Sequence, residues 1–300
     1  MYTTLISAQA LANQIQSARQ LLIFDTSFEL MNPAAGESQF TEAHIPGAVF
    51  VHLDRDLSSH SPTDRASGGR HPLPLREDFA AWLDQMGLGP ETQVVVYDRQ
   101  GANYCGRLWW MVKWCGHEAV AVLDGGWQAW QAAGGTTESG PPVQRVASAP
   151  GGFTLGDPLV RLVVTPELSR QLGAPTLTVI DARAAARFRG EMEPLDPIAG
   201  HIPGALNRPF VNNIGANGCF KPSEVLRAEF ETLLAGRDPA SAVHHCGSGV
   251  SAIPNILGME IAGLGRSALY AGSWSEWSNT PGLPCAKTQV PNTAADTSGY

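Results

Sequence analysis

The segment His44-Ile-Pro-Gly-Ala48 recurs as His201-Ile-Pro-Gly-Ala205, 157 residues further along the chain. A second pair follows in the same order, because Gly125-Gly-Trp-Gln-Ala-Trp130 corresponds to Gly272-Ser-Trp-Ser-Glu-Trp277, at an offset of 147. Solenoid repeats have units of only about 20 to 50 residues. The spacing therefore indicates one domain present in two copies.

Length and composition fit two globular domains. The chain has 300 residues, 43% of them hydrophobic and 16% charged, which favours packed cores over disorder. A net charge of −8 without a basic cluster argues against a nucleic-acid partner. No apolar run approaches the roughly 18 residues of a membrane span. The first residues lack the features of a secretory signal, and five cysteines are few, so we expect a cytoplasmic protein with reduced thiols.

Short apolar runs alternate with amphipathic stretches in both halves. We expect strands at Leu21–Asp25, Val94–Asp98, Ala119–Leu123, Leu177–Asp181, Ala242–His245 and Ser267–Tyr270. We expect helices from Ser7, over Asp78–Met86, over Arg107–Trp114, from Trp127, from Thr165 (a cap residue followed by Pro166), near Ser223–Leu234, from about Ala252 and at Trp274. This alternation predicts an α/β fold in which each domain has a parallel sheet flanked by helices.

The segment from Gly134 to Gly152 is rich in turn formers and has no apolar periodicity, so we interpret it as a linker. The predicted division is an N-terminal domain at 1–138, a linker at 139–156, a C-terminal domain at 157–285 and a tail at 286–300.

The two copies differ most after one strand. Where the first half has Asp98, the second has Cys246, which opens the sequence Cys246-Gly-Ser-Gly-Val-Ser-Ala252 before a helix. A glycine-containing loop at this sheet edge can turn backbone N–H groups toward the sulfur and stabilise its thiolate, which predicts a nucleophilic cysteine. A Cys-x5-Arg phosphatase would need arginine where this chain has Ala252, which argues against a phosphatase.

These motifs together resemble the two-domain rhodanese family of sulfurtransferases over residues 5 to about 285. The resemblance implies two tandem rhodanese-like domains, a catalytically inactive first copy and a Cys246 that carries sulfur as a persulfide. Within the family, Cys-Gly-Ser-Gly-Val is similar to the 3-mercaptopyruvate type, since thiosulfate enzymes usually carry basic residues at the positions of Gly247 and Ser248. Cys105 in the first copy is interpreted as a non-catalytic thiol.

The resemblance also implies the substrate-binding residues. The loop members Gly247, Gly249, Val250 and Ser251 would surround the donor. Two arginines hold the substrate in mercaptopyruvate enzymes; Arg187 matches the first, but Leu195 occupies the second position. Arg183 and Arg189 lie nearby in the sequence as possible substitutes.

A Ser–His–Asp relay is a further implication of the resemblance. The matching residues are Ser248, His71 and Asp54, with Asp56 as an alternative to Asp54. His71 belongs to the first half and Ser248 to the second, so this relay would cross the domain interface. Histidine accepts protons near neutral pH, and a carboxylate fixes its tautomer.

Other conspicuous residues have structural interpretations. His244 and His245 are strand residues rather than metal ligands, because no other Cys/His pair has ligand spacing. Asp25 and Asp181 are interpreted as loop caps, and Arg183 as the partner of an acid. Helical spacing predicts packing roles for the indoles of Trp109, Trp110, Trp127, Trp130, Trp274 and Trp277.

The resulting hypothesis is a cytoplasmic sulfurtransferase without metal or organic cofactor. It would move sulfur from a small donor, with 3-mercaptopyruvate favoured, to cyanide, a thiol or thioredoxin. Three alternatives stay open: a thiosulfate:cyanide sulfurtransferase, a non-enzymatic carrier that passes sulfur between proteins, and a phosphatase. Neither a nucleic acid nor a membrane is an expected partner.

Overall fold

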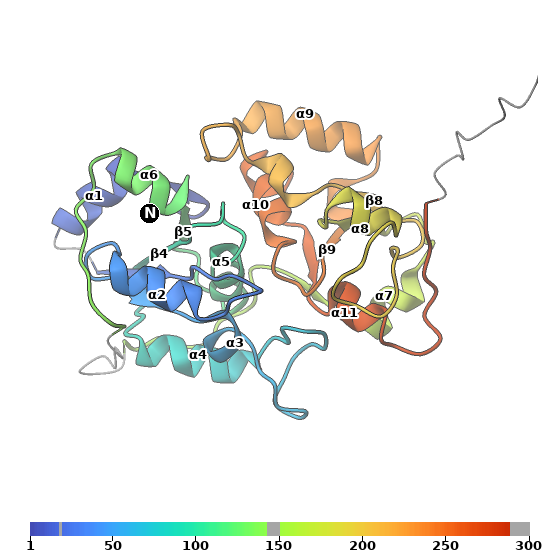
Figure 1. The fold of residues 1–300 in the computed structure, drawn as a ribbon, viewed down its shortest axis with the longest axis horizontal. Coiled ribbons are helices and arrows are strands. Elements are labelled where there is room, and N and C mark those ends of the chain that lie inside the picture. The colour runs from blue at the N-terminus through green and yellow to red at the C-terminus, as the bar shows by residue number, and fades with distance from the viewer. Residues whose placement is uncertain (18–19, 143–150, 289–300) are drawn as a thin grey trace, which may run out of the picture.

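A computed structural model describes residues 1–17, 20–142 and 151–288. These residues form two parallel five-stranded sheets with the same strand order, β1-β5-β4-β2-β3 and β6-β10-β9-β7-β8. The first sheet contains β1 (Leu5–Ile6), β2 (Leu21–Asp25), β3 (Val49–Phe50), β4 (Gln93–Tyr97) and β5 (Val120–Leu123). The second contains β6 (Leu162–Val163), β7 (Thr178–Asp181), β8 (Leu206–Asn207), β9 (Ala242–His245) and β10 (Ala268–Tyr270). The expected α/β duplication is confirmed, and Figure 1 shows the two copies side by side.

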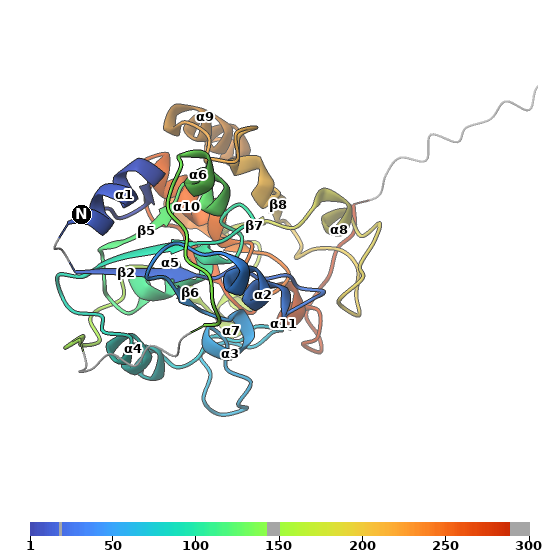
Figure 2. The same cartoon turned by 60° about the vertical axis from the view of Figure 1, so that its left-hand side comes forward.

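Helices cover both faces of each sheet. The first domain has α1 (Ala8–Gln16), α2 (Ala35–Glu42), α3 (Leu53–Asp56), α4 (Arg76–Gln85), α5 (Cys105–Trp114) and α6 (Gly126–Ala132). The second has α7 (Thr165–Gln171), α8 (Ala185–Arg189), α9 (Ser223–Leu234), α10 (Ile253–Ile261) and α11 (Ser273–Trp277), with 3-10 turns at Phe210–Asn213 and Pro239–Ser241. In the first domain, α1 and α6 pack on one face, and α4 and α5 on the other (Figure 2).

The two domains share a hydrophobic core. Helices α5 and α10 pack against each other at the centre of the molecule (Figure 1). Their approach is close at Gly106, where a Cβ would lie 3.1 Å from Cγ2 of Ile253. Every residue of α5 is buried, and its Lys113 forms an ion pair with Glu260 of α10 at 3.4 Å. This packing holds the carboxyl end of β9 against loops of the first domain.

The structure corrects several expected element boundaries. Helix α7 has Val164 rather than Thr165 as its N-cap, because the Thr165 hydroxyl forms a hydrogen bond of 2.7 Å with the hydroxyl of Tyr270. Helix α4 begins two residues earlier than expected, at Arg76. Strands of two residues, such as β1, are too short to produce a sequence period and were not expected.

The proposed domain limits stay a prediction. Residues 143–150 of the predicted linker and 289–300 of the predicted tail lie outside the described residues. The described end of the linker packs on the first domain, where the N–H groups of Gly152 and Phe153 donate to Asp84 Oδ1. At the start of the predicted tail, Ala286 exchanges two backbone hydrogen bonds with His201.

The indoles have the packing role that their spacing predicts, since all six are at most 6% exposed. None of the helices in the described residues is long and apolar enough to cross a membrane.

Candidate active site

Cys246 lies directly after β9, at the carboxyl end of the second sheet, and its residue surface is 2% exposed. Its N–H donates to Ser273 Oγ at 3.1 Å, and its carbonyl accepts the N–H of Trp274 at 3.0 Å. Ser273 has φ of +56°, a left-handed conformation that costs a non-glycine residue energy. A strained residue at the start of α11 therefore fixes the backbone that carries the sulfur.

The loop at 247–252 turns around that sulfur. The N–H of Ser248 donates to Sγ of Cys246 at 3.5 Å. Gly249 has φ of +76°, and a Cβ there would lie 2.3 Å from the carbonyl oxygen of Ala271. Only glycine fits this position, so the glycine in the sequence is required by the turn.

The other backbone N–H groups of the loop have no hydrogen-bond acceptor among the described residues. They belong to Gly247, Gly249, Val250, Ser251 and Ala252. All of these residues except half-buried Ser251 are buried, and buried backbone N–H groups seldom go unbonded. The loop thus offers hydrogen-bond donors for an anion. Of its backbone N–H groups, that of Ser248 donates to the sulfur itself.

Three residues from two domains form a hydrogen-bonded chain that ends beside Cys246. His71 Nδ1 lies 2.8 Å from Ser248 Oγ, and His71 Nε2 lies 3.3 Å from Asp54 Oδ1. His71 comes from the loop before α4 and Asp54 from α3. The alternative acid, Asp56, instead accepts the backbone N–H of His52 at 2.7 Å. The structure therefore brings together the three residues that the resemblance implies.

The charges in this chain suit a proton acceptor. Burial lowers the pKa of His71 below its ordinary value, and Asp54 only partly opposes this shift. The hydrogen bond to His71 lowers the pKa of Asp54. The carboxylate can only accept, so Nε2 of the neutral imidazole carries the proton. Nδ1 is left free to take the hydroxyl proton of Ser248.

Arg187 of α8 lies against the cysteine loop. Its Nη1 is 3.5 Å from the point that a Cβ of Gly247 would occupy. Two acids of the loop after α8 hold the guanidinium, with Nη2 at 2.5 Å from Glu193 Oε1 and at 3.4 Å from Asp196 Oδ2. Leu195 lies between these acids, and its N–H donates to Glu193.

Neither substitute suggested by the sequence reaches the loop. Arg183 is 4% exposed and is held by Asp181 at 2.7 Å and by Glu193 at 3.2 Å. This ion pairing matches the structural role expected for Arg183 and Asp181. Arg189 forms an exposed pair with Glu191 on the surface. Neither Arg183 nor Arg189 is therefore positioned to replace the arginine that is absent at position 195.

Two first-domain arginines that the sequence did not single out approach the loop. Nη2 of Arg70 is 3.4 Å from the Cβ point of Gly247. Arg107 of α5 is fully buried and donates to the carbonyl oxygens of Gly249 at 3.1 Å and His71 at 2.9 Å. Arg70 directly precedes His71 in the sequence, and this position could have indicated that it lies near the site. Arg107 lies in a tryptophan-rich helix, where no motif distinguishes it.

Arg107 places a positive charge behind the cysteine. The hydrogen bonds of Arg107 to the described residues all go to carbonyl oxygens, and the third of these belongs to Leu57. Burial lowers the pKa of Arg107 to about 10, and negative charge at Cys246 opposes that shift.

His244 and His245 are buried side chains of β9. His245 Nε2 lies 3.6 Å from Asp181, and His244 Nε2 contacts the sulfur of Met259 at 3.1 Å. Within the described parts of the chain, no cluster of three or more His, Cys, Asp or Glu side chains is arranged to hold a metal ion.

Residues 7–133 and 164–280 each match the rhodanese-like domain family. The chain belongs to the rhodanese family. A probable 3-mercaptopyruvate sulfurtransferase of Pseudomonas aeruginosa is 44% identical, over 94% of this chain and 97% of the relative. A putative thiosulfate sulfurtransferase of Mycobacterium tuberculosis is 39% identical, over 94% and 96% respectively.

Solved structures of rhodanese-family proteins agree. SseA of Escherichia coli, described as a 3-mercaptopyruvate sulfotransferase, superposes with a TM-score of 0.74 at 30% identity, over 92% of this chain and all of that one. The protein is therefore a rhodanese-type sulfurtransferase, an enzyme of the mercaptopyruvate or thiosulfate class whose members transfer sulfur through a persulfide.

Proposed function

We propose that the donor is 3-mercaptopyruvate and that Cys246 receives its sulfur. The observation that carries this proposal is the chain Asp54–His71–Ser248, which joins the cysteine loop to a neutral imidazole. Mercaptopyruvate is a thiol, so its own proton must leave the sulfur during transfer and return to carbon in pyruvate. Thiosulfate brings no such proton and would not need the relay.

In the proposed first step the thiolate of Cys246 attacks the donor sulfur. An S–S bond forms, the C–S bond breaks, and its electron pair becomes the enolate of pyruvate. Ser248 takes the thiol proton and passes its own to Nδ1 of His71, and the same path returns a proton to the enolate carbon. Cys246 is left as a persulfide anion.

The charges around the loop support this step. The enolate and carboxylate of the leaving pyruvate are anionic, and Arg187 presents a guanidinium beside Gly247. The unbonded loop amides and buried Arg107 favour negative charge on the outer and inner sulfur atoms. We assign substrate contacts to Arg187 and to the loop residues Gly247, Gly249, Val250 and Ser251.

In the second step an acceptor nucleophile attacks the outer sulfur. The S–S bond breaks, and its electron pair returns to Cys246 as thiolate. Cyanide, a small thiol or thioredoxin has the chemistry for this role. All five cysteines are unpaired, which fits the reducing cytoplasm that we propose as the location.

Thiosulfate is the second candidate donor. The relative from Mycobacterium tuberculosis is named for it, and two guanidinium groups beside the loop suit a dianion. A carrier that receives sulfur only from a protein partner would keep the persulfide but react with neither small donor.

Intact-mass spectrometry after exposure to each donor tests the proposal. The expected result is one added sulfur atom on the wild type with mercaptopyruvate, formed faster than with thiosulfate, and none on Cys246→Ser. Faster loading by thiosulfate would make it the donor. A wild type inert toward both donors but loaded by a persulfidated protein would favour the carrier.

A further inference from the structure

Arg70 is positioned to complete the donor site from the other domain. We propose that Arg70 is the second substrate-binding guanidinium and that, together with Arg187, it binds the carboxylate of the 2-oxo acid donor. This inference rests on the proposed function. It explains how a chain with Leu195 at the expected arginine position can still hold its donor between two cations.

Both guanidinium groups lie over the same point of the cysteine loop. The Cβ point of Gly247 is 3.4 Å from Nη2 of Arg70 and 3.5 Å from Nη1 of Arg187. Gly247 directly follows Cys246. The two cations therefore flank the residue next to the nucleophile, where the charged end of a three-carbon donor would lie.

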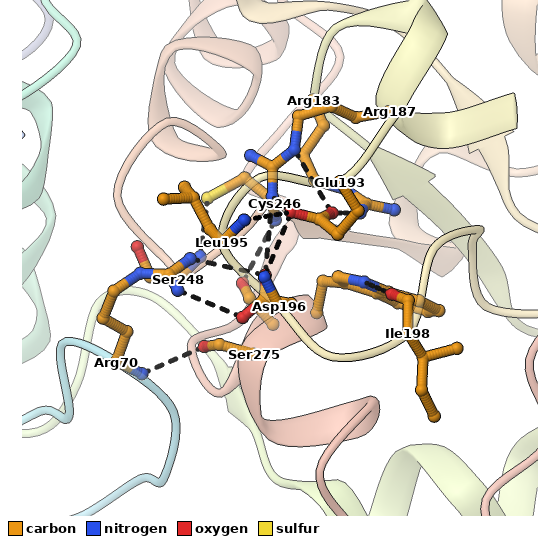
Figure 3. Close-up of polar contacts among 12 residues, drawn as sticks. Arg70, Arg183, Arg187, Glu193, Leu195, Asp196, Ile198, Cys246, Ser248 and Ser275 are labelled. Carbon is orange, nitrogen blue, oxygen red and sulfur yellow. Dashed lines mark hydrogen bonds and ion pairs between the residues drawn. The ribbon is translucent and has the colours of Figure 1, made fainter. Parts of the chain in front are cut away.

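One buried acid holds the two cations side by side. Asp196 Oδ1 accepts from Nη1 of Arg70 at 3.0 Å, while its Oδ2 lies 3.4 Å from both Nη2 of Arg70 and Nη2 of Arg187. The side chain of Asp196 is 2% exposed. Figure 3 shows Arg70 reaching across from the first domain toward Asp196. Both cations are thus oriented before any donor binds, which reduces the entropy cost of binding.

The pair still has hydrogen-bond donors for a ligand. A guanidinium has five N–H groups, and Asp196 accepts from only two nitrogens of Arg70. The buried Nε of Arg70 has no acceptor in the described part of the chain. A carboxylate is the group whose two oxygens match such a fork.

The backbone of Arg70 is anchored to the second domain. Its N–H donates to Ser275 Oγ at 2.9 Å. The preceding Gly69 has φ of +87°, and a Cβ there would lie 2.5 Å from the carbonyl oxygen of Gly272. The loop that carries Arg70 therefore sits against the start of α11, which also fixes the backbone of Cys246 through Ser273.

Leu195 and Arg70 line one cleft. This cleft has a volume of about 560 Å³ and lies between the domains, with Arg65, Asp196, Ser275 and Glu276 also in its wall. An arginine substituted at 195 would extend from the wall of the same cleft as Arg70. The two positions are alternative origins for one positive charge, which makes a relocation experiment possible.

The test measures kcat/KM for two donors that differ only in the carboxylate, 3-mercaptopyruvate and mercaptoacetone, with rates referred to the folded fraction. For Arg70→Met we expect a loss of roughly ten- to a hundred-fold with mercaptopyruvate, the effect of removing a charged hydrogen bond. We expect less than about a three-fold loss with mercaptoacetone, and an intermediate loss with mercaptopyruvate for Arg70→Lys.

A second variant moves the charge. Arg70→Met combined with Leu195→Arg should recover most of the mercaptopyruvate rate, whereas surface control Arg189→Met should match the wild type. Equal losses with the two donors, or a full mercaptopyruvate rate in Arg70→Met, would overturn the inference alone. A wild type that mercaptopyruvate cannot load would overturn the proposed donor as well.

Discussion

The loops after β4 and β9 each have seven residues, but they open with different residues, Asp98 in the first domain and Cys246 in the second. In the first domain the carboxylate of Asp98 folds back into its own loop and accepts four backbone N–H groups at 2.8–3.0 Å, from Gln100, Ala102, Tyr104 and Cys105. In the second domain Cys246 receives one N–H bond, and five loop amides have no acceptor among the described residues. In the first loop the side chain of Asp98 accepts these N–H groups, and in the second loop we expect a bound anion to accept them.

Two backbone features near Asp98 and Cys246 recur in both copies. Trp127 donates its N–H to the carbonyl of Asp98 at 3.0 Å, as Trp274 does to the carbonyl of Cys246. Helices α6 and α11 begin with the same φ of +56°, at Gly126 and at Ser273, although the residues before them differ, with φ of +77° at Gly125 and −58° at Gly272. The two copies thus share one fold and differ in the residue at this strand end, which is a carboxylic acid in the first copy and a thiol in the second.

The nearby thiol of the first copy lies in surroundings that disfavour its thiolate. Cys105 is buried, and burial together with the Asp98 carboxylate raises the pKa of its thiol well above the ordinary value. The same carboxylate accepts its backbone N–H. These contacts agree with the interpretation of Cys105 as a non-catalytic thiol.

The largest effect is expected when Cys246 is replaced by aspartate, the residue that the first domain has at this position. Cys246→Asp should abolish sulfur transfer from both donors, because the nucleophile is gone. Its carboxylate would accept the unbonded loop amides, so its melting temperature should exceed that of Cys246→Ser by about 2–4 °C. Thermal unfolding of the two variants checks this, and a lower value for Cys246→Asp would show that the two loops are not equivalent.

An intermediate effect is expected when the relay is weakened. Protonated His71 cannot accept a proton, so wild-type turnover of mercaptopyruvate should fall as the pH is lowered through the pKa of His71. Because burial lowers that pKa, the fall should be centred below 6.5, the ordinary value for histidine. Asp54 raises that pKa, so Asp54→Asn should move the acid limb to still lower pH. Asp54→Asn should also lower the maximal turnover, reached above this pH, about ten-fold, because the tautomer of His71 is no longer fixed.

Kinetics across the acid limb with each donor would measure this effect. Thiosulfate carries no thiol proton, so its turnover should be much less sensitive to Asp54→Asn. A limb that moves to higher pH, or an equal loss with both donors, would remove the relay from the proposed mechanism.

The smallest effect on sulfur transfer is expected in the loop of Asp98. Asp98→Asn keeps one acceptor oxygen but turns an amide NH₂ toward N–H groups that had an acceptor, which should lower the free energy of unfolding by about 1–3 kcal/mol. Sulfur transfer should stay within about two-fold of wild type. Urea denaturation and donor kinetics measure both, and a catalytic loss comparable to that of Cys246→Asp would give the first loop a part in the reaction.

The sequence predicted the parts of the fold and site that have local signals. Neighbouring residues were enough to predict the duplicated motifs, the long apolar strands and the loop of Cys246. His71 and Asp54 were reached through family resemblance, and the structure brings them to Ser248. Two-residue strands such as β3 were missed, because a period needs more residues to appear.

The missed arginines show where such reasoning stops. Arg70 is 177 residues from Gly247 in the sequence, and only the folded interface places the two in contact. The sequence instead pointed to Arg183 and Arg189, which are near Leu195 along the chain but engaged elsewhere. The positive charge that is absent at Leu195 in the second domain can be supplied by Arg70 of the first domain, and no local sequence pattern predicts this.

The guanidinium of Arg107 has a wider consequence. It is a first-domain group that bonds the carbonyl oxygens of Leu57 and His71 in its own domain and of Gly249 in the other. A chain cut within the predicted linker would therefore yield two fragments, neither of which holds a working centre. Turnover would return only on reassembly and would vary with fragment concentration, as in a split reporter enzyme.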